Sequence, residues 1–258
     1  MTSALDAFLE YSDRLAANAQ AHPDVVGLVL VGSGADLERV DEWSDHDFFL
    51  IVKDGTAEGF RQDLSWLPDS ENVVIRPRET DHGLKVVYRN GHVLEFAVFD
   101  DKELEMASVN YWSVPVDKTN ITSRVEALEK KTVGGKFEEE KEWELFLAHI
   151  LIAVGRARRG ELLIAGQAIR SYMMRHTLGF LRDRLAPVPG TEGIEDNLDR
   201  FRRVERQYPA EGARLDHILQ LPVEDSARAQ LDFVLGLGGF SDKQHEQAEV
   251  VRQRLGWS

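Results

Sequence analysis

Two acidic residues, Asp45 and Asp47, are the side chains best suited to chemistry, because they stand just before the apolar run of residues 48–52. If a β-strand begins here, side chains at positions i and i+2 point to the same face. Carboxylates that stand side by side raise one another's pKa or require a counter-charge. A hard divalent ion such as Mg²⁺, held by carboxylates together with substrate phosphates, supplies that charge. The alternative is a solvated strand end, where the two acids only cap a turn.

A glycine and a serine, Gly32 and Ser33, follow the preceding apolar run, Val25–Val31, which we expect to be the neighbouring strand. Glycine lets the backbone approach a phosphate closely, and exposed N–H groups at such a bend can bind phosphate oxygens. A polar connector, residues 34–44, then leads to the two acids. The combination favours a site for metal and phosphate over a turn cap.

This combination resembles the signature of the nucleotidyltransferase superfamily, which is an apolar strand, Gly-Ser or Gly-Gly, about a dozen residues, and then two acids entering the next strand. The residues that match are Gly32, Ser33, Asp45 and Asp47. The closest likeness is to the aminoglycoside and lincosamide adenylyltransferases, in which a helical domain follows the catalytic one. The motif-bearing resemblance covers residues 25–99, and His46 departs from it, since the family usually has an apolar residue there.

A third acid, Glu95, lies in the predicted strand at residues 92–99, which follows a strong hairpin signal, Asn-Gly, at residues 90–91. Its neighbours on both faces of that strand are apolar, and a buried acid requires a partner. The resemblance implies that a third carboxylate joins the two aspartates, as a metal ligand or as the base that deprotonates the acceptor hydroxyl. The alternative is an ion pair with Arg76 or Lys85.

The resemblance implies transfer of a nucleoside monophosphate, AMP from ATP in the simplest case, to a hydroxyl of a small cationic molecule such as an aminoglycoside or lincosamide. Asp45, Asp47 and Glu95 are then the catalytic and Mg²⁺-binding residues, and Gly32 and Ser33 hold the phosphates of the nucleoside triphosphate. The alternative is a non-catalytic or regulatory module, such as a toxin–antitoxin partner. A third reading is the same chemistry on a protein or a nucleic acid.

The composition of the chain helps to choose among these possible functions. The formal net charge of −14 over 258 residues argues against broad binding to nucleic acid and favours a cationic small-molecule partner. The chain has no cysteine, which excludes disulfides and cysteine-bound zinc. The first ten residues do not look like a signal peptide, and no stretch approaches a membrane span, so we expect a cytoplasmic protein without a membrane partner.

Periodicity predicts an α+β fold, in which a mixed sheet with flanking helices is followed by an all-α helical bundle. We place the nucleotidyltransferase-like catalytic domain at residues 1–119 and the helical substrate-binding domain at residues 120–258. The passage at residues 109–119 has no clear periodicity. The helices expected after it are residues 137–159, 161–185, 195–207, 223–237 and 242–255. Four arginines of the third of these, Arg200, Arg202, Arg203 and Arg206, indicate a solvated helix face or, alternatively, a triphosphate contact.

Overall fold

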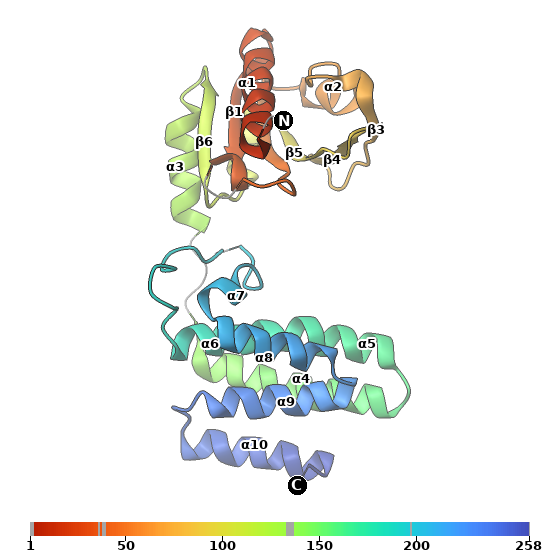
Figure 1. Ribbon diagram of the computed structural model, residues 1–258, viewed down its shortest axis with the longest axis vertical. Helices are drawn as coiled ribbons and strands as arrows, with labels where there is room; N and C mark the ends of the chain where they lie inside the picture. The colour runs from red at the N-terminus through yellow and green to blue at the C-terminus, as the bar shows by residue number, and fades with distance from the viewer. Residues whose placement is uncertain (1–2, 36, 38–39, 133–136, 197, 258) are drawn as a thin grey trace. The chain divides into compact units, whose positions relative to one another are not determined.

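The computed structural model describes residues 3–35, 37, 40–132, 137–196 and 198–257. The chain divides into two compact units, Met1–Val133 and Gly134–Ser258, and each is considered by itself. The first unit contains a six-stranded sheet, and the described part of the second consists of helices and loops (Figure 1). The predicted α+β fold class is therefore confirmed.

The sheet of the first unit is mixed, with the strand order β3-β4-β5-β2-β1-β6. Strands β2 and β5 lie side by side and run parallel, whereas the other neighbouring pairs are antiparallel. Their parallel pairing requires a long connection, which carries α2, β3 and β4. The strands are β1 (Val25–Val31), β2 (His46–Val52), β3 (Val73–Ile75), β4 (Gly83–Tyr88), β5 (Val93–Asp100) and β6 (Trp112–Asp117).

Alternation of side chains gives the sheet two apolar faces, and each face has its own helices. Helices α1 (Ala4–Ala21) and α2 (Ala57–Gln62) pack on the face that carries Phe48. Helix α3 (Ile121–Thr132) packs on the opposite face, which carries Ile51. In Figure 1, α1 runs along strand β1, and α3 lies beside β6. The sheet is thus a middle layer between these helices.

Strand β6 occupies residues that the sequence suggested were an irregular passage between domains. It pairs antiparallel with β1 at the edge of the sheet. Proline has no backbone N–H and cannot donate a hydrogen bond to a neighbouring strand. An edge strand tolerates Pro115, because no strand lies on its outer side to need that donor. Of the six residues only Val116 is fully buried, so the strand shows neither a continuous apolar run nor a clear alternation.

Helix α3 extends the first unit beyond the boundary that we expected between residues 119 and 120. The Asp117 carboxylate accepts the backbone N–H of Ile121 at 2.7 Å and so caps the start of the helix. Ile121 then packs directly on Gly27 of strand β1, where an added Cβ would lie 2.6 Å from its Cγ1 atom. The two compact units are divided after Val133 for this reason.

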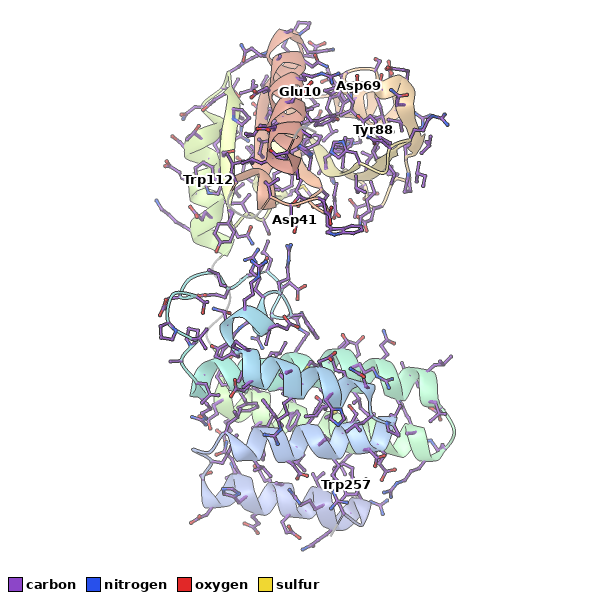
Figure 2. All side chains as sticks on the ribbon, in the orientation of Figure 1. Glu10, Asp41, Asp69, Tyr88, Trp112 and Trp257 are labelled. Carbon is purple, nitrogen blue, oxygen red and sulfur yellow. The ribbon has the colours of Figure 1, made fainter. Side chains whose placement is uncertain are left out.

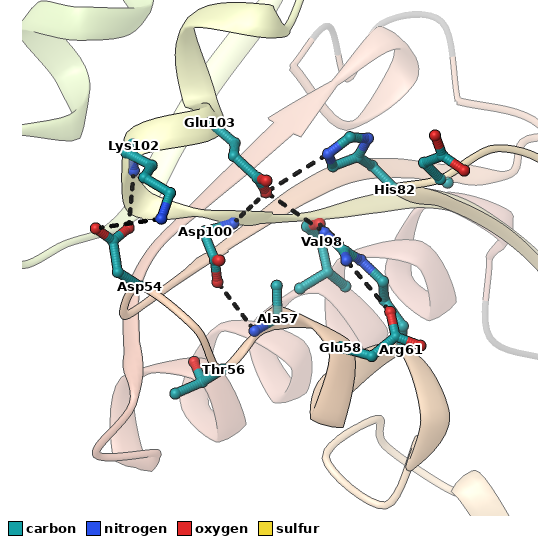
Figure 3. A network of polar contacts seen from close by, with 12 residues as sticks. Asp54, Thr56, Ala57, Glu58, Arg61, His82, Val98, Asp100, Lys102 and Glu103 are labelled. Carbon is teal, nitrogen blue, oxygen red and sulfur yellow. Dashed lines mark hydrogen bonds and ion pairs between the residues drawn. The ribbon is translucent and has the colours of Figure 1, made fainter.

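A network of polar contacts holds the C-terminal end of β5, around Val98 and Asp100 (Figure 3). Asp100 accepts the backbone N–H of Ala57, at the start of α2, at 3.0 Å. The Arg61 guanidinium of the same helix donates to the Val98 carbonyl oxygen at 2.6 Å. The Asp100 N–H donates to the Glu103 carboxylate at 3.1 Å, which starts the following 3-10 helix. Both short helices are thereby bonded to β5.

The helical unit contains α4 (Glu139–Arg158), α5 (Leu162–Gln167), α6 (Met174–Arg184), α7 (Val204–Gln207), α8 (Pro209–Gln220), α9 (Val223–Gly236) and α10 (Asp242–Leu255). Its core includes the fully buried rings of Trp143, Phe146, Phe180 and Phe233. The C-terminal Trp257 also belongs to this core (Figure 2). No described helix is both long and apolar enough to cross a bilayer.

Two predicted helices of this unit differ in the structure. The expected helix at residues 161–185 contains a π-helical segment, η5 (Ala168–Met173), between α5 and α6. The expected helix at residues 195–207 is helical only in α7, because Arg203 has a left-handed backbone (φ 64°) just before it. Arg202 and Arg203 form ion pairs with the buried Asp196, so these two arginines do not form the predicted solvated helix face.

Candidate active site

The structure brings the three predicted acids together at one end of the sheet. Asp45 immediately precedes β2, Asp47 lies at the start of that strand, and Glu95 lies near the start of β5. Because β2 and β5 are parallel and Asp47 pairs directly with Glu95, these two side chains share a face. Carboxylate oxygens of all three residues lie within 4.8 Å of one another.

Gly32 borders this cluster and leaves room for it. Its φ of +61° lies in the left-handed region that favours glycine, and an added Cβ would lie 2.7 Å from Oδ2 of Asp47. Its N–H donates to the Tyr111 carbonyl oxygen at 3.3 Å, so that donor is engaged within the protein. A side chain at position 32 would therefore collide with the Asp47 carboxylate, which explains the glycine. From the sequence we had expected the backbone at this bend to bind phosphate.

Ser33 is described only as part of the 3-10 helix η1 (Gly32–Ala35). Its side chain falls outside the described residues. Its predicted contact with phosphate stays a prediction.

Glu95 differs from the expectation of a buried acid. Its side chain is 49% exposed, and the Lys85 ammonium of the neighbouring strand β4 lies 3.4 Å from Oε2. The ion pair with Lys85 that we considered as an alternative is therefore present, and Glu95 is at the same time part of the acidic cluster. A hydrogen bond to Glu79 and, secondarily, the charge of Glu95 raise the pKa of Lys85. Arg76 instead donates to the Gln62 carbonyl oxygen.

On the opposite face of the sheet, a pair of histidines joins the two strands that carry the acids. His46, between Asp45 and Asp47, is 2% exposed and stacks on Phe8 with ring centroids 3.7 Å apart. Its Nδ1 lies 2.8 Å from Nε2 of His92, in the turn that leads into β5. Burial, and then the charge of His92, lowers the pKa of His46 to about 3.

The hydrogen bonds of His46 determine its tautomer. Nε2 lies 3.1 Å from the Phe8 carbonyl oxygen, which can only accept, and 3.1 Å from the Ser12 hydroxyl, which can accept or donate. A proton on Nε2 satisfies both contacts. The neutral ring then accepts at Nδ1, and His92 donates from Nε2. This hydrogen bond connects the start of β2 to the start of β5 directly behind the carboxylates. The apolar residue that the family usually has here is thus replaced by a polar side chain that is fully bonded.

A pocket of about 1050 Å³ also opens beside His46 and His92, on the face of the sheet that α1 covers. Glu10 of α1, Asp41, Asp69 and Tyr88 are among the residues that line it, and all four are labelled in Figure 2. The Asp47 and Glu95 side chains point to the other face of the sheet. The pocket therefore does not contain the acidic cluster.

The residues present fit a divalent cation. Mg²⁺ takes carboxylate oxygens, and here three carboxylates approach closely enough to share one ion. The backbone holds two of the three, since Asp47 and Glu95 sit on paired strands. In the described part of the chain, this is the group of three acidic or imidazole side chains whose ligand atoms converge.

No protein-family model matches the sequence, and no curated protein matches it. Solved nucleotidyltransferases are among its structural matches. An aminoglycoside 6-adenyltransferase from Bacillus subtilis matches with 13% identity and a TM-score of 0.32, over 100% of this chain and 93% of that one. A nucleotidyltransferase-like protein from Exiguobacterium sibiricum matches with 9% identity and a TM-score of 0.36, over 96% and 78% of the two chains.

CdnC of E. coli MS115-1, in complex with HORMA-deltaN, matches with 14% identity and a TM-score of 0.32, over 99% of this chain and 91% of that one. Likenesses with TM-scores this low carry no argument about chemistry, whereas the carboxylate cluster does.

Two contacts at this site were not predicted from the sequence. The sequence left open whether Lys85 or Arg76 pairs with Glu95, and it gave no indication that His92 contacts His46. The Lys85 contact follows from the β4–β5 register, in which the two residues are paired. The hairpin closes through a three-residue loop, residues 89–91, in which Gly91 has a positive φ. Counting back from a two-residue Asn-Gly turn would instead pair Glu95 with Val86, so the sequence alone does not select Lys85. The histidine contact carries no sequence signal either, because it joins strands that are not consecutive in the chain.

Proposed function

We propose that the protein is a Mg²⁺-dependent nucleotidyltransferase. In this proposal it transfers a nucleoside monophosphate, AMP from ATP in the simplest case, to a hydroxyl of a small cationic molecule such as an aminoglycoside or lincosamide. The observation that carries the proposal is the convergence of three carboxylates within 4.8 Å beside a glycine that makes room for them. The formal net charge of −14 supports a cationic acceptor.

Asp45, Asp47 and Glu95 are the residues that would hold Mg²⁺. When bound, Mg²⁺ offsets the negative charge that develops on the transferring phosphoryl group and on the leaving pyrophosphate. Strand pairing holds the Asp47 backbone, and the absence of a side chain at Gly32 leaves room for its carboxylate. The carboxylate would therefore need little rearrangement to bind Mg²⁺. Ser33 would contact the phosphates.

Glu95 would take the proton of the acceptor hydroxyl. Its half-exposed side chain can reach a substrate that arrives from solvent. The acceptor oxygen then forms a bond to the α-phosphorus, and the bond between that phosphorus and the bridging oxygen of pyrophosphate breaks. A positioned base of this kind contributes about 10²- to 10⁴-fold to the rate.

The test compares Asp47→Asn with Asp13→Asn, which makes the same charge change at an exposed position of α1. We expect D47N to lose Mg²⁺-dependent ATP binding in calorimetry. It should also lose pyrophosphate release with a panel of aminoglycosides and lincosamides. D13N should keep both. Retained activity in D47N refutes the metal assignment, and absence of metal-dependent nucleotide binding in the wild type favours the regulatory module.

A further inference from the structure

A second polar pocket lies within the helical unit. It has a volume of about 330 Å³. The residues that line it are Glu142, His149, Tyr172, Arg175, His176 and Arg200. They come from α4, η5, α6 and the loop before α7, so four segments converge on one point. Pockets that combine convergent polar groups are candidate binding sites.

The single carboxylate of this pocket has both oxygens engaged by neighbouring side chains. The His176 ring donates from Nδ1 to Glu142 at 2.5 Å, and Arg200 approaches the other oxygen of the same carboxylate at 3.5 Å. That hydrogen bond occupies Nδ1 of His176, so Nε2 is the ring nitrogen that remains for a ligand. Glu142 therefore orients the two side chains around it.

Two nitrogen-bearing groups remain without partners. Within residues 137–196 and 198–257, the Arg175 guanidinium forms no hydrogen bond or ion pair, although its backbone carbonyl accepts from Arg200. Nδ1 of His149 is buried and unbonded in the same part of the chain. A buried polar atom without a partner costs free energy, so its persistence calls for a ligand or a bound water.

The backbone at the pocket is also unusual. Tyr172 belongs to the π-helical segment η5, directly before α6, which carries Arg175 and His176. A π-helical turn inserts an extra residue into the helix and shifts the side chains that follow, and such segments occur frequently at functional sites. Here it places an exposed tyrosine 6.1 Å from the His149 ring, between ring centroids.

We propose that this pocket binds a phosphate group, either free or carried by a small molecule. Arg175 supplies a forked donor without a competing partner, and Arg200 adds a second positive charge nearby. The pocket thus holds two arginine charges against one carboxylate, in a protein whose formal net charge is −14. A tetrahedral phosphate accepts hydrogen bonds from several directions, which suits donors that arrive from different segments better than a planar carboxylate does.

Phosphate binding here is independent of the proposed nucleotidyl transfer. The lining residues all belong to the helical unit, whereas Asp45, Asp47 and Glu95 belong to the other unit. The phosphate site also uses arginine donors and needs no divalent cation. It should therefore bind its ligand in the presence of a chelator, which removes the ion that the acidic cluster would need.

The experiment is calorimetric titration of the full-length protein with inorganic phosphate in the presence of EDTA. We expect saturable binding that Arg175→Gln weakens at least about tenfold, since charge-assisted hydrogen bonds are lost. The control Arg254→Gln removes the same charge from an exposed position of α10 and should bind as the wild type does. Asp47→Asn should also bind normally, which separates this site from the acidic cluster.

A parallel titration with ribose 5-phosphate identifies the source of the phosphate. Tighter binding than inorganic phosphate, lost in R175Q, supports an organic phosphate whose hydroxyl donates to Nε2 of His176. Equal affinity supports free phosphate. Absence of saturable phosphate binding by the wild type, or unchanged affinity in R175Q, overturns the proposal. If R175Q loses its helical circular dichroism, His149→Asn provides the second variant, and the same tenfold weakening is expected.

Discussion

At the scale of single residues, Gly32 has the most sharply defined environment near the acids. Its backbone is left-handed, and the missing side chain leaves the space that the Asp47 carboxylate occupies. Gly55 offers a matched comparison, because its φ is also positive (82°) but an added Cβ there would meet nothing within 4 Å. The two positions separate backbone strain from displacement of the carboxylate.

We predict that Gly32→Ala destabilises the protein by about 1–3 kcal/mol and abolishes Mn²⁺ or Mg²⁺ binding measured by calorimetry. Gly55→Ala should carry a similar backbone cost and leave metal binding unchanged. Equal metal affinity in the two variants would show that the Asp47 carboxylate does not depend on the space at Gly32.

The buried His46 gives a prediction about acid stability. Its pKa is about 3 in the folded protein, against about 6.5 in the unfolded chain, so between these values only the unfolded chain binds the proton. The contribution is complete above pH 6.5 and is lost as the pH falls toward 3, at about 1.4 kcal/mol per pH unit. His92, whose pKa burial also lowers, acts in the same direction.

Denaturant unfolding at several pH values between 6.5 and 4 measures this slope. His46→Phe removes the titrating group while keeping an aromatic ring beside Phe8, so its free energy of unfolding should fall less steeply with acid. His217→Gln, at an exposed histidine of α8, should retain the wild-type slope. An unchanged slope in H46F would mean that His46 is not held neutral.

At the scale of elements, helix α3 is positioned by the absence of a side chain at Gly27. An added Cβ would lie 2.6 Å from Cγ1 of Ile121, which is completely buried. The contact joins β1 to the helix at the sheet face on which Asp47 and Glu95 also point. Overpacking at this contact should therefore move the helix and not merely a flexible side chain.

We predict that Gly27→Ala lowers the free energy of unfolding by about 1–3 kcal/mol. Ile121→Ala alone costs about 2–5 kcal/mol because it leaves a cavity. In the double variant the added methyl group occupies part of that cavity, so the combined loss should be smaller than the sum of the single losses. A double-mutant cycle measures the coupling, and additive losses would contradict direct packing of Ile121 on Gly27.

The elements also show why sequence patterns succeeded or failed. Strands β1 and β2 and helices α1, α4 and α10 have strong periodicity, so local pattern alone located them. The alternation rule likewise placed Asp45 and Asp47 on a common face, whereas the expectation that Glu95 joins them came from the family resemblance. Strand β6 was not predicted, because its local sequence pattern is weak and its pairing with β1 is what makes it a strand. A π-helical turn such as η5 was not predicted either, because it has no characteristic sequence periodicity. The exposure of Glu95 depends on which elements pack on that face of the sheet, which the strand sequence does not encode.

At the scale of the whole molecule, each cluster of buried apolar side chains lies within one of the two units. One cluster lies in the helical unit, and the other two lie on the two faces of the sheet. Phe233 of α9 is 1% exposed and belongs to the helical cluster. A cavity created there should act first on the helices that share that cluster.

We predict that Phe233→Ala costs the helical unit about 3–5 kcal/mol. Hydrogen exchange followed by mass spectrometry should show faster exchange in α4, α6 and α9, with little change in β1, β2 and β5. Gly27→Ala should give the reverse pattern. Equal acceleration in both units by either variant would show that the chain unfolds as one cooperative body.

The parallel pairing of β2 with β5 has a consequence for how the protein responds to its surroundings. The acids at the two strand starts are far apart along the chain and meet only after the intervening segment has closed, which is an entropically costly event. A cation bound by all three acids is therefore a ligand of the native state alone, and mass action makes that state more stable as the ion concentration rises. Depletion of the ion would then lower the free energy of unfolding as well as remove the metal from the proposed active centre.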